Sequence, residues 1–130
     1  MTKESLCRTE FQKEGLNMDC LFCKIANKEI PSKTVYEDDK VYSFYDIEPQ
    51  APVHVLIIPK AHIASALEID DTNCDIVAHV FKVAAKIARD LGIAEDGYRI
   101  VTNIGKDGGQ TVGHLHFHML GGRNLGWPQG

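Results

Sequence analysis

Three histidines alternate near the end of the sequence, at His114, His116 and His118, and they are half of the six histidines in the chain. In a strand, alternate side chains share a face, so this spacing predicts one face of imidazoles and an opposite apolar face. A neutral imidazole can act as a nucleophile, a general base or a metal ligand. A structural cluster is the alternative, although buried imidazoles are costly without a purpose. The three spread over roughly 13 Å of strand, too far to share one ion comfortably.

A glycine-rich loop at 103–111 precedes these histidines. Backbone N–H groups of its glycines can approach an anion closely, and the amides of Asn103 and Gln110 and the hydroxyl of Thr111 lie beside them. Taken alone, such a loop is more typical of an ordinary hairpin, because Asp-Gly is a common turn signal. Next to three histidines, it favours a phosphate-binding loop.

Cys20 and Cys23 form a Cys-x-x-Cys pair, within a total of four cysteines. Such a pair is found in redox sites, in zinc sites and as two small buried residues. No thioredoxin-like pattern of strand, helix and strand surrounds it, which argues against the redox pair, one of these three interpretations.

The composition restricts the class of protein. With 130 residues, 44% hydrophobic and 25% charged, the chain suits one compact domain. A net charge of -4 argues against nucleic-acid binding, which needs a clustered excess of Lys and Arg. No apolar run reaches the roughly 20 residues of a membrane helix, and no signal peptide is recognisable, so we expect a cytoplasmic protein that binds no membrane.

The apolar pattern predicts an α+β fold with a largely antiparallel sheet, one short helix and one long helix. The nearly all-apolar run 53–58 is typical of a central strand buried on both faces. In the long helix, Thr72 and Asp75 resemble a capping box, Gly92 is the expected C-cap, and His79 falls on the solvated face. The predicted elements are a short helix within 19–30 capped by Asp19, strands at 34–36, 41–46, 53–58, 98–104 and 112–120, a flexible arm at 1–17 and a folded domain at 18–130.

These motifs carry a resemblance to a known family. Asn103, Gly108, Gln110 and Val112, followed by the run His-Leu-His-Phe-His-Met-Leu-Gly from His114, resemble the signature of the histidine-triad superfamily. Its members are nucleotide hydrolases and transferases that act on the α-phosphate. The resemblance extends over about 19–130. The ending Gly-Gly-Arg-Asn-Leu-Gly-Trp-Pro-Gln-Gly is similar to the Hint branch, the purine nucleoside phosphoramidases.

Other branches fit less well. Diadenosine-polyphosphate hydrolases usually follow the triad with Pro-Arg, where this chain has Gly121, Gly122 and Arg123, and nucleotidyltransferases replace the third histidine, here His118, with Gln. The resemblance therefore implies a hydrolase that splits the P–N bond of purine nucleoside 5′-phosphoramidates into a nucleoside monophosphate and an amine. Dinucleoside polyphosphate hydrolysis, or a nucleotide- or zinc-binding regulatory module with vestigial catalysis, are the alternatives.

The resemblance also assigns roles. It makes His116 the nucleophile that forms a nucleotidyl-histidine intermediate, and it places His54 beside the triad as a hydrogen-bonding partner. The Thr111 hydroxyl would face the leaving amine, and the Asp46 carboxylate would accept from the ribose. The residues implied around the phosphate are Asn103, Gly109, Gln110, Thr111, His116 and His118, and those around the base are Leu21, Phe22, Ile25, Phe44 and Ile47. Without the family, these apolar residues read as plain core.

Some related proteins complete a Cys-x-x-Cys pair to a zinc site with the histidine of a Pro-x-x-His segment and the first triad histidine. Here the resemblance implies Cys20, Cys23, His62 and His114 as ligands of a structural zinc with no open position. It implies no organic cofactor. It further implies a HIT-like fold with a five-stranded sheet that continues across a homodimer, with the tail near Trp127 reaching toward the partner's site.

Overall fold

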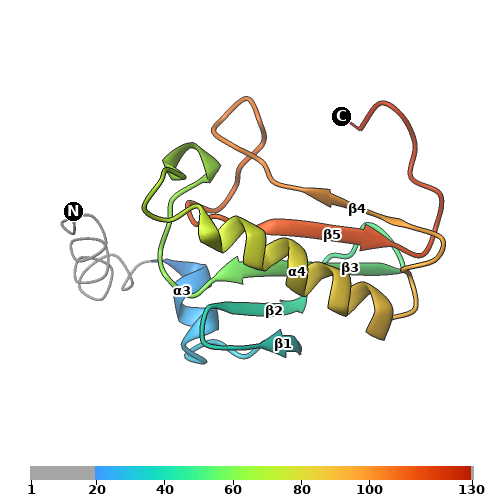
Figure 1. Ribbon diagram of the computed structural model, residues 1–130, viewed down its shortest axis with the longest axis horizontal. Coiled ribbons are helices and arrows are strands. Elements are labelled where there is room, and N and C mark those ends of the chain that lie inside the picture. The colour runs from blue at the N-terminus through green and yellow to red at the C-terminus, as the bar shows by residue number, and fades with distance from the viewer. Residues whose placement is uncertain (1–19, 130) are drawn as a thin grey trace.

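The computed structural model describes residues 20–129, which form one sheet with a helix on each face (Figure 1). The arm at 1–17 and the Asp19 cap lie outside the described residues. In this part of the chain, no helix combines the length and apolar character needed to cross a membrane. The elements are α3 (Leu21–Ala26), β1 (Thr34–Glu37), β2 (Val41–Tyr45), β3 (Val53–Pro59), the 3-10 turn η2 (Ala66–Glu68), α4 (Asp75–Asp90), β4 (Tyr98–Val101) and β5 (Phe117–Gly121).

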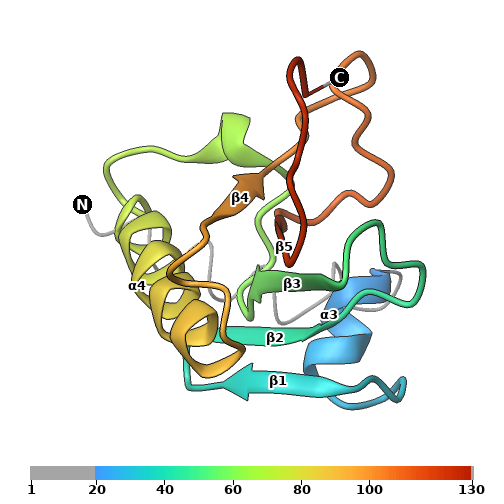
Figure 2. The same cartoon turned by 90° about the vertical axis from the view of Figure 1, so that its right-hand side faces the viewer.

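The five strands pair in the order β1-β2-β3-β5-β4, and every neighbouring pair is antiparallel. Figure 2 shows α4 and α3 on opposite faces of this sheet. The central strand β3 is buried on both faces: Val55 and Ile57 join the cluster under α4, while Leu56 and Ile58 join the cluster under α3. The predicted fold class and the predicted two-sided burial of 53–58 are confirmed.

Helix α4 packs its apolar stripe on the sheet and ends as its sequence predicts. Gly92 follows the C-cap in a left-handed conformation (φ +77°), where a side chain would be strained, and the next N–H reaches back to the Ala88 carbonyl. The predicted capping box is wrong. The Thr72 hydroxyl donates to Asp70 Oδ1 at 2.6 Å, and the helix begins at Asp75, after Cys74 as an N-cap that makes no side-chain bond.

Two further sequence predictions need correction. Helix α3 ends at Ala26, before the predicted limit at residue 30, because Lys28 adopts a left-handed conformation (φ 66°). His79 is not solvated on the polar face of α4, since its Nε2 lies 2.7 Å from Asp38 Oδ2. That contact joins the long helix to the turn between β1 and β2.

The last hairpin is shorter than predicted, and this changes how the histidines are held. Ladder pairing of β5 starts at Phe117, so His118 lies in the sheet, whereas His114 and His116 precede it. The backbone just before β5 bonds elsewhere: Leu115 N donates to Ile63 O at 2.6 Å, and the His116 carbonyl accepts from Thr102 Oγ1 at 2.8 Å. The strand stops because other segments satisfy these backbone groups.

Candidate active site and metal centre

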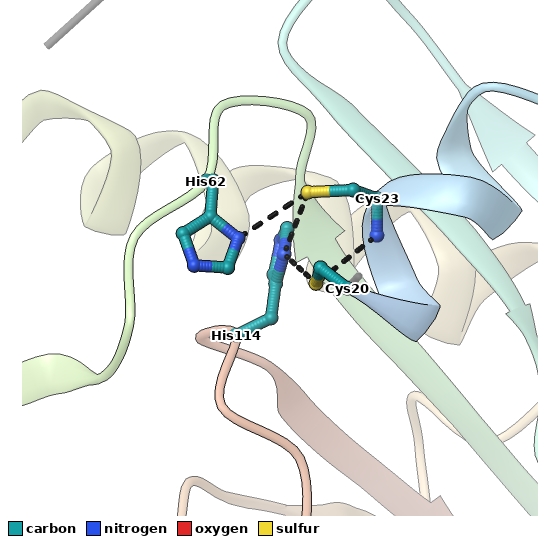
Figure 3. A group of neighbouring side chains, drawn as sticks. All are labelled: Cys20, Cys23, His62 and His114. Carbon is teal, nitrogen blue, oxygen red and sulfur yellow. Dashed lines mark hydrogen bonds between the residues drawn. The ribbon is translucent and has the colours of Figure 1, made fainter. Parts of the chain in front are cut away.

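The first triad histidine joins the cysteine pair in a tetrad (Figure 3). His114 Nδ1 lies 3.3 Å from Cys20 Sγ and 3.5 Å from Cys23 Sγ, and His62 Nδ1 lies 3.3 Å from Cys23 Sγ. All four ligand atoms are within 4.8 Å of one another. The cysteines belong to the start of α3, while His62 follows β3 and His114 precedes β5. Three segments distant in the chain thus converge on one point.

The tetrad is suited to hold a metal ion. His114 Nε2 faces the Pro59 carbonyl at 2.9 Å, so it carries the proton and leaves the lone pair of Nδ1 toward the two sulfurs. Burial lowers the pKa of His114 to about 4, which keeps the ring neutral. Burial and the neighbouring Cys20 raise the pKa of the Cys23 thiol to about 12, and a bound cation would reverse this because it deprotonates a ligand thiol. Two sulfurs and two imidazoles are a donor set typical of tetrahedral zinc.

The third triad histidine belongs to a different group, with His54 and Asp46. His54 Nε2 lies 3.0 Å from His118 Nδ1 and 3.4 Å from Asp46 Oδ2. The backbone N–H of Gln50 donates to His54 Nδ1 at 3.0 Å, so the proton of neutral His54 must be on Nε2. That proton is donated to His118 Nδ1. His118 in turn carries its own proton on Nε2.

Both imidazoles of this group are neutral near pH 7. Burial lowers the pKa of His118 to about 4, assisted by the neighbouring His116 and His54. Burial also lowers the pKa of His54, against the opposing effect of Asp46. Although Asp46, His54 and His118 lie close enough to ligate an ion, the proton on His54 Nε2 occupies the position that a metal would need. A hydrogen-bonded chain describes this group better than a metal site.

His116 lies between the two groups and has the opposite tautomer to His118. Its Nδ1 donates to the His114 carbonyl at 2.7 Å, which leaves a lone pair on Nε2. His116 is 4% exposed, and the centroid of its ring lies 5.1 Å from that of His118 and 5.0 Å from that of Phe22. Two adjacent imidazoles therefore offer one bare Nε2 and one Nε2–H. The first can attack an electrophile, and the second can donate to an anion.

The glycine-rich loop is held closed by side chains that the sequence assigned to the phosphate. The Gln110 amide accepts from Gly105 N at 2.9 Å and donates to the carbonyls of Ala64 and Val112 at 2.8 and 2.9 Å. All of these partners are backbone groups. Gln110 therefore shapes the loop and ties it to the segment after β3.

Asn103 closes the other side of the loop, where its Nδ2 donates to the Gly108 carbonyl at 2.7 Å. A Cβ at Gly108 would lie 2.3 Å from the carbonyl oxygen of Ile104, so only glycine permits this close approach. Gly109 adopts a left-handed conformation (φ +81°), and Thr111 is exposed beside it. The loop is exposed, and the N–H groups of Gly105, Gly109 and Gln110 donate to acceptors within it.

The residues predicted to surround a base differ in their exposure to solvent. Phe22, Ile25 and Phe44 are buried together between α3 and β2, with Phe22 edge-on to His116. Leu21 is 45% exposed and Ile47 is 94% exposed. The sequence-based prediction missed the backbone groups of Gln50 and Pro59 that set the imidazole protons, and no residue type signals them.

Comparison with known proteins agrees with this architecture. The family model of the HIT domain matches residues 27–125, which is most of the chain. The chain belongs to the HIT family. The sequence is 49% identical to the purine nucleoside phosphoramidase of Escherichia coli over 108 residues, covering 83% of this chain and 91% of that protein.

Solved structures of HIT family hydrolases are also similar. One from Clostridium thermocellum is 55% identical, with a TM-score of 0.82 over 84% of this chain and 95% of that chain. Another from Legionella pneumophila is 49% identical, with a TM-score of 0.85 over 86% of this chain and 100% of that chain. These relatives confirm the predicted HIT-like fold, and they identify this HIT protein as an enzyme of the hydrolase class.

Proposed function

We propose that this HIT hydrolase cleaves the P–N bond of purine nucleoside 5′-phosphoramidates. The observation that carries the proposal is the pair of opposite tautomers, a bare Nε2 on His116 next to an Nε2–H on His118. The Escherichia coli relative, named a purine nucleoside phosphoramidase, supports the substrate class.

The first displacement uses His116 as the nucleophile. Its Nε2 attacks phosphorus while the P–N bond breaks, and this splits a difficult hydrolysis into two easier steps. His118 Nε2–H donates to a phosphoryl oxygen, where negative charge develops, together with Asn103 and the Gly109 N–H. The Gly109 N–H exchanges its partner in the free protein, the Lys106 carbonyl, for the phosphate. The leaving nitrogen takes a proton from solvent through the Thr111 hydroxyl, so the amine departs neutral, and the later attack of water returns a proton to solvent. Water then attacks the nucleotidyl-histidine, which releases the nucleoside monophosphate and restores His116.

The nucleoside part lies on the α3 side of this site. Phe22, Ile25 and Phe44 line one wall of the base slot, and the exposed Leu21 and Ile47 close over it. The ribose hydroxyls donate to Asp46, whose Oδ1 already accepts from Glu48 N at 2.8 Å, leaving the second oxygen available beside His54.

The tetrad of Cys20, Cys23, His62 and His114 would hold a structural zinc ion with all four ligands from the protein, and the ion would supply a cross-link between three segments. The assembly is a homodimer in which β4, an edge strand of the sheet, pairs with a second copy. The exposed Trp127 then lies close to the partner. Light scattering at micromolar concentration should give twice the chain mass, and a monomeric mass would contradict the dimer.

The deciding experiment follows AMP release from adenosine 5′-phosphoramidate. The wild-type chain should release AMP, and His116→Ala should abolish release. An equally active variant would refute the nucleophile. A wild-type chain inactive on the phosphoramidate but active on diadenosine polyphosphates would assign the leaving group differently, and inactivity on both would favour a regulatory binding module.

A further inference from the structure

One side chain, Phe22, contacts both the tetrad and the proposed nucleophile His116. Phe22 lies between Cys20 and Cys23 in the sequence of α3, and its ring packs edge-on against His116, with centroids 5.0 Å apart at 82°. The same ring also meets His114 edge-on, with centroids 6.0 Å apart at 75°. Any movement of the start of α3 would therefore move the Phe22 ring, which packs against His116.

The tetrad and the nucleophile also share a short piece of backbone. The carbonyl of His114 accepts the Nδ1 proton of His116 at 2.7 Å, so the orientation of that peptide sets the tautomer. The intervening Leu115 donates its N–H to the carbonyl of Ile63, the residue that follows His62. The peptide that orients His116 is thus anchored at both ends to segments carrying tetrad ligands.

The paired strands of the sheet do not include this segment. The β5 ladder starts at Phe117 and β3 ends at Pro59, so neither His116 nor His62 lies in it. Helix α3 has six residues, too few to be stable by itself in water. A metal ion bound by the tetrad would link the start of α3, the segment after β3 and the segment before β5. This link would be the strongest constraint on the position of His116 that these residues can provide.

We propose that the tetrad, when it holds a metal ion, is a positioning device that keeps His116 in its Nδ1–H tautomer, and that Phe22 is a positioning residue in this coupling. The metal then affects the reaction without contacting the substrate. Only the expected effect on kcat rests on the proposed function. Its structural consequence is that emptying the tetrad frees the His116 ring.

The first test observes the ring directly. Tag-free protein labelled with ¹⁵N-histidine is compared by NMR when loaded with zinc, after removal of zinc by a chelator, and after zinc is restored. The ring signals are assigned with His116→Gln. Loaded protein should show His116 only as the Nδ1–H tautomer, and emptied protein should show a mixture that zinc reverses. In parallel, kcat should fall by about tenfold on emptying, while KM should change by less than about twofold.

The second test separates the contact from the stability of the helix. Phe22→Leu removes the aromatic edge but leaves all four ligands. Lys24→Gly weakens the same helix through the low helix propensity of glycine, and Lys24 lies outside the buried cluster that contains Phe22. Both variants should bind zinc with the stoichiometry of the wild type. Phe22→Leu should show a mixture of His116 tautomers, and Lys24→Gly should show the single tautomer. Should removal of zinc unfold the chain, this pair decides the question.

A single Nδ1–H tautomer in emptied protein or in Phe22→Leu would overturn the coupling, as would equal tautomer mixtures in both variants. These NMR measurements need no nucleotide. A loaded wild-type chain that releases no AMP, yet changes tautomer on emptying, would refute the proposed function and leave the coupling intact.

Discussion

His54 Nε2 donates to His118 Nδ1 over 3.0 Å, although the two residues are 64 positions apart in the sequence. Because Gln50 N–H occupies the other nitrogen of His54, the direction of this hydrogen bond is determined. The consequence is a neutral His118 that presents Nε2–H to the site. Adjacent strands β3 and β5 bring the two rings together.

Replacing His54 should slow catalysis through His118. In His54→Leu no donor faces His118 Nδ1, so His118 can place its proton on either nitrogen, and kcat should fall by about tenfold. His54→Gln supplies an amide donor of similar reach and should recover much of the loss. Steady-state kinetics on the phosphoramidate check both variants. Equal kcat values for the two would show that the donated proton is unimportant.

Replacing Thr111 should reveal the leaving group. Thr111→Ser keeps the hydroxyl and should remain near wild-type activity, whereas Thr111→Val keeps the shape and removes the donor. The valine variant should lose about tenfold in kcat for alkylamine leaving groups and much less for weakly basic aromatic amines, which need less help to leave. If kcat fell by the same factor for every amine, the Thr111 hydroxyl would not assist the departure of the amine.

A zinc site requires stoichiometric metal and thiolate ligands. Elemental analysis of tag-free protein should find one zinc per chain, and cobalt substitution should give the thiolate charge-transfer band typical of sulfur ligands. Cys23→Ser should lose the band and the metal. Cys74→Ser is the matched control, because Cys74 is exposed at the start of α4, outside the tetrad. Much less than one zinc per active chain would refute the site.

The glycine loop should not tolerate a side chain at one position. In Gly108→Ala the new methyl would lie 2.3 Å from the Ile104 carbonyl oxygen, so the loop must open and phosphate binding should weaken, raising KM by about tenfold. Gly113→Ala is the control, because a Cβ there meets nothing within 4 Å. Similar KM values for the two variants would show that the closed loop is not needed.

Asp38 makes stability depend on pH. Burial alone would raise its pKa, but hydrogen bonds from the N–H groups of Lys40 and Val41 and from His79 and Tyr36 lower it below its usual range. A carboxyl with a lowered folded-state pKa stabilises the protein above its unfolded value of roughly 3.9, and this stability is lost as the pH falls below it.

Asp38→Asn should therefore reduce the free energy of unfolding at pH 7 by about 1–3 kcal/mol, and the difference from wild type should shrink toward pH 3. Urea unfolding at both pH values checks this. Asp39→Asn is the neighbouring control, since Asp39 is exposed and should have little effect. A difference that persists at low pH would attribute the effect to packing rather than charge.

Local patterns predicted the elements well, because burial on one face or two leaves a direct trace in residue spacing. The five strands, the two-faced run at 53–58 and the stripe of α4 were all predicted from their sequence patterns. Ends were predicted less well. The capping box at Thr72 and the long last hairpin were wrong because Asp70 and Ile63 supply competing partners that a local pattern does not contain.

By itself, the sequence determined the inventory of the site: three histidines, a cysteine pair, a glycine-rich loop and the family to which they belong. Only the tertiary structure decided how the histidines divide, with His114 joining the sulfurs, His118 joining His54, and His116 between them. The reason is that an imidazole can carry its proton on either nitrogen. That choice depends on backbone carbonyl and N–H groups brought in from distant segments, and these groups are the same in every residue type except proline, which lacks the N–H.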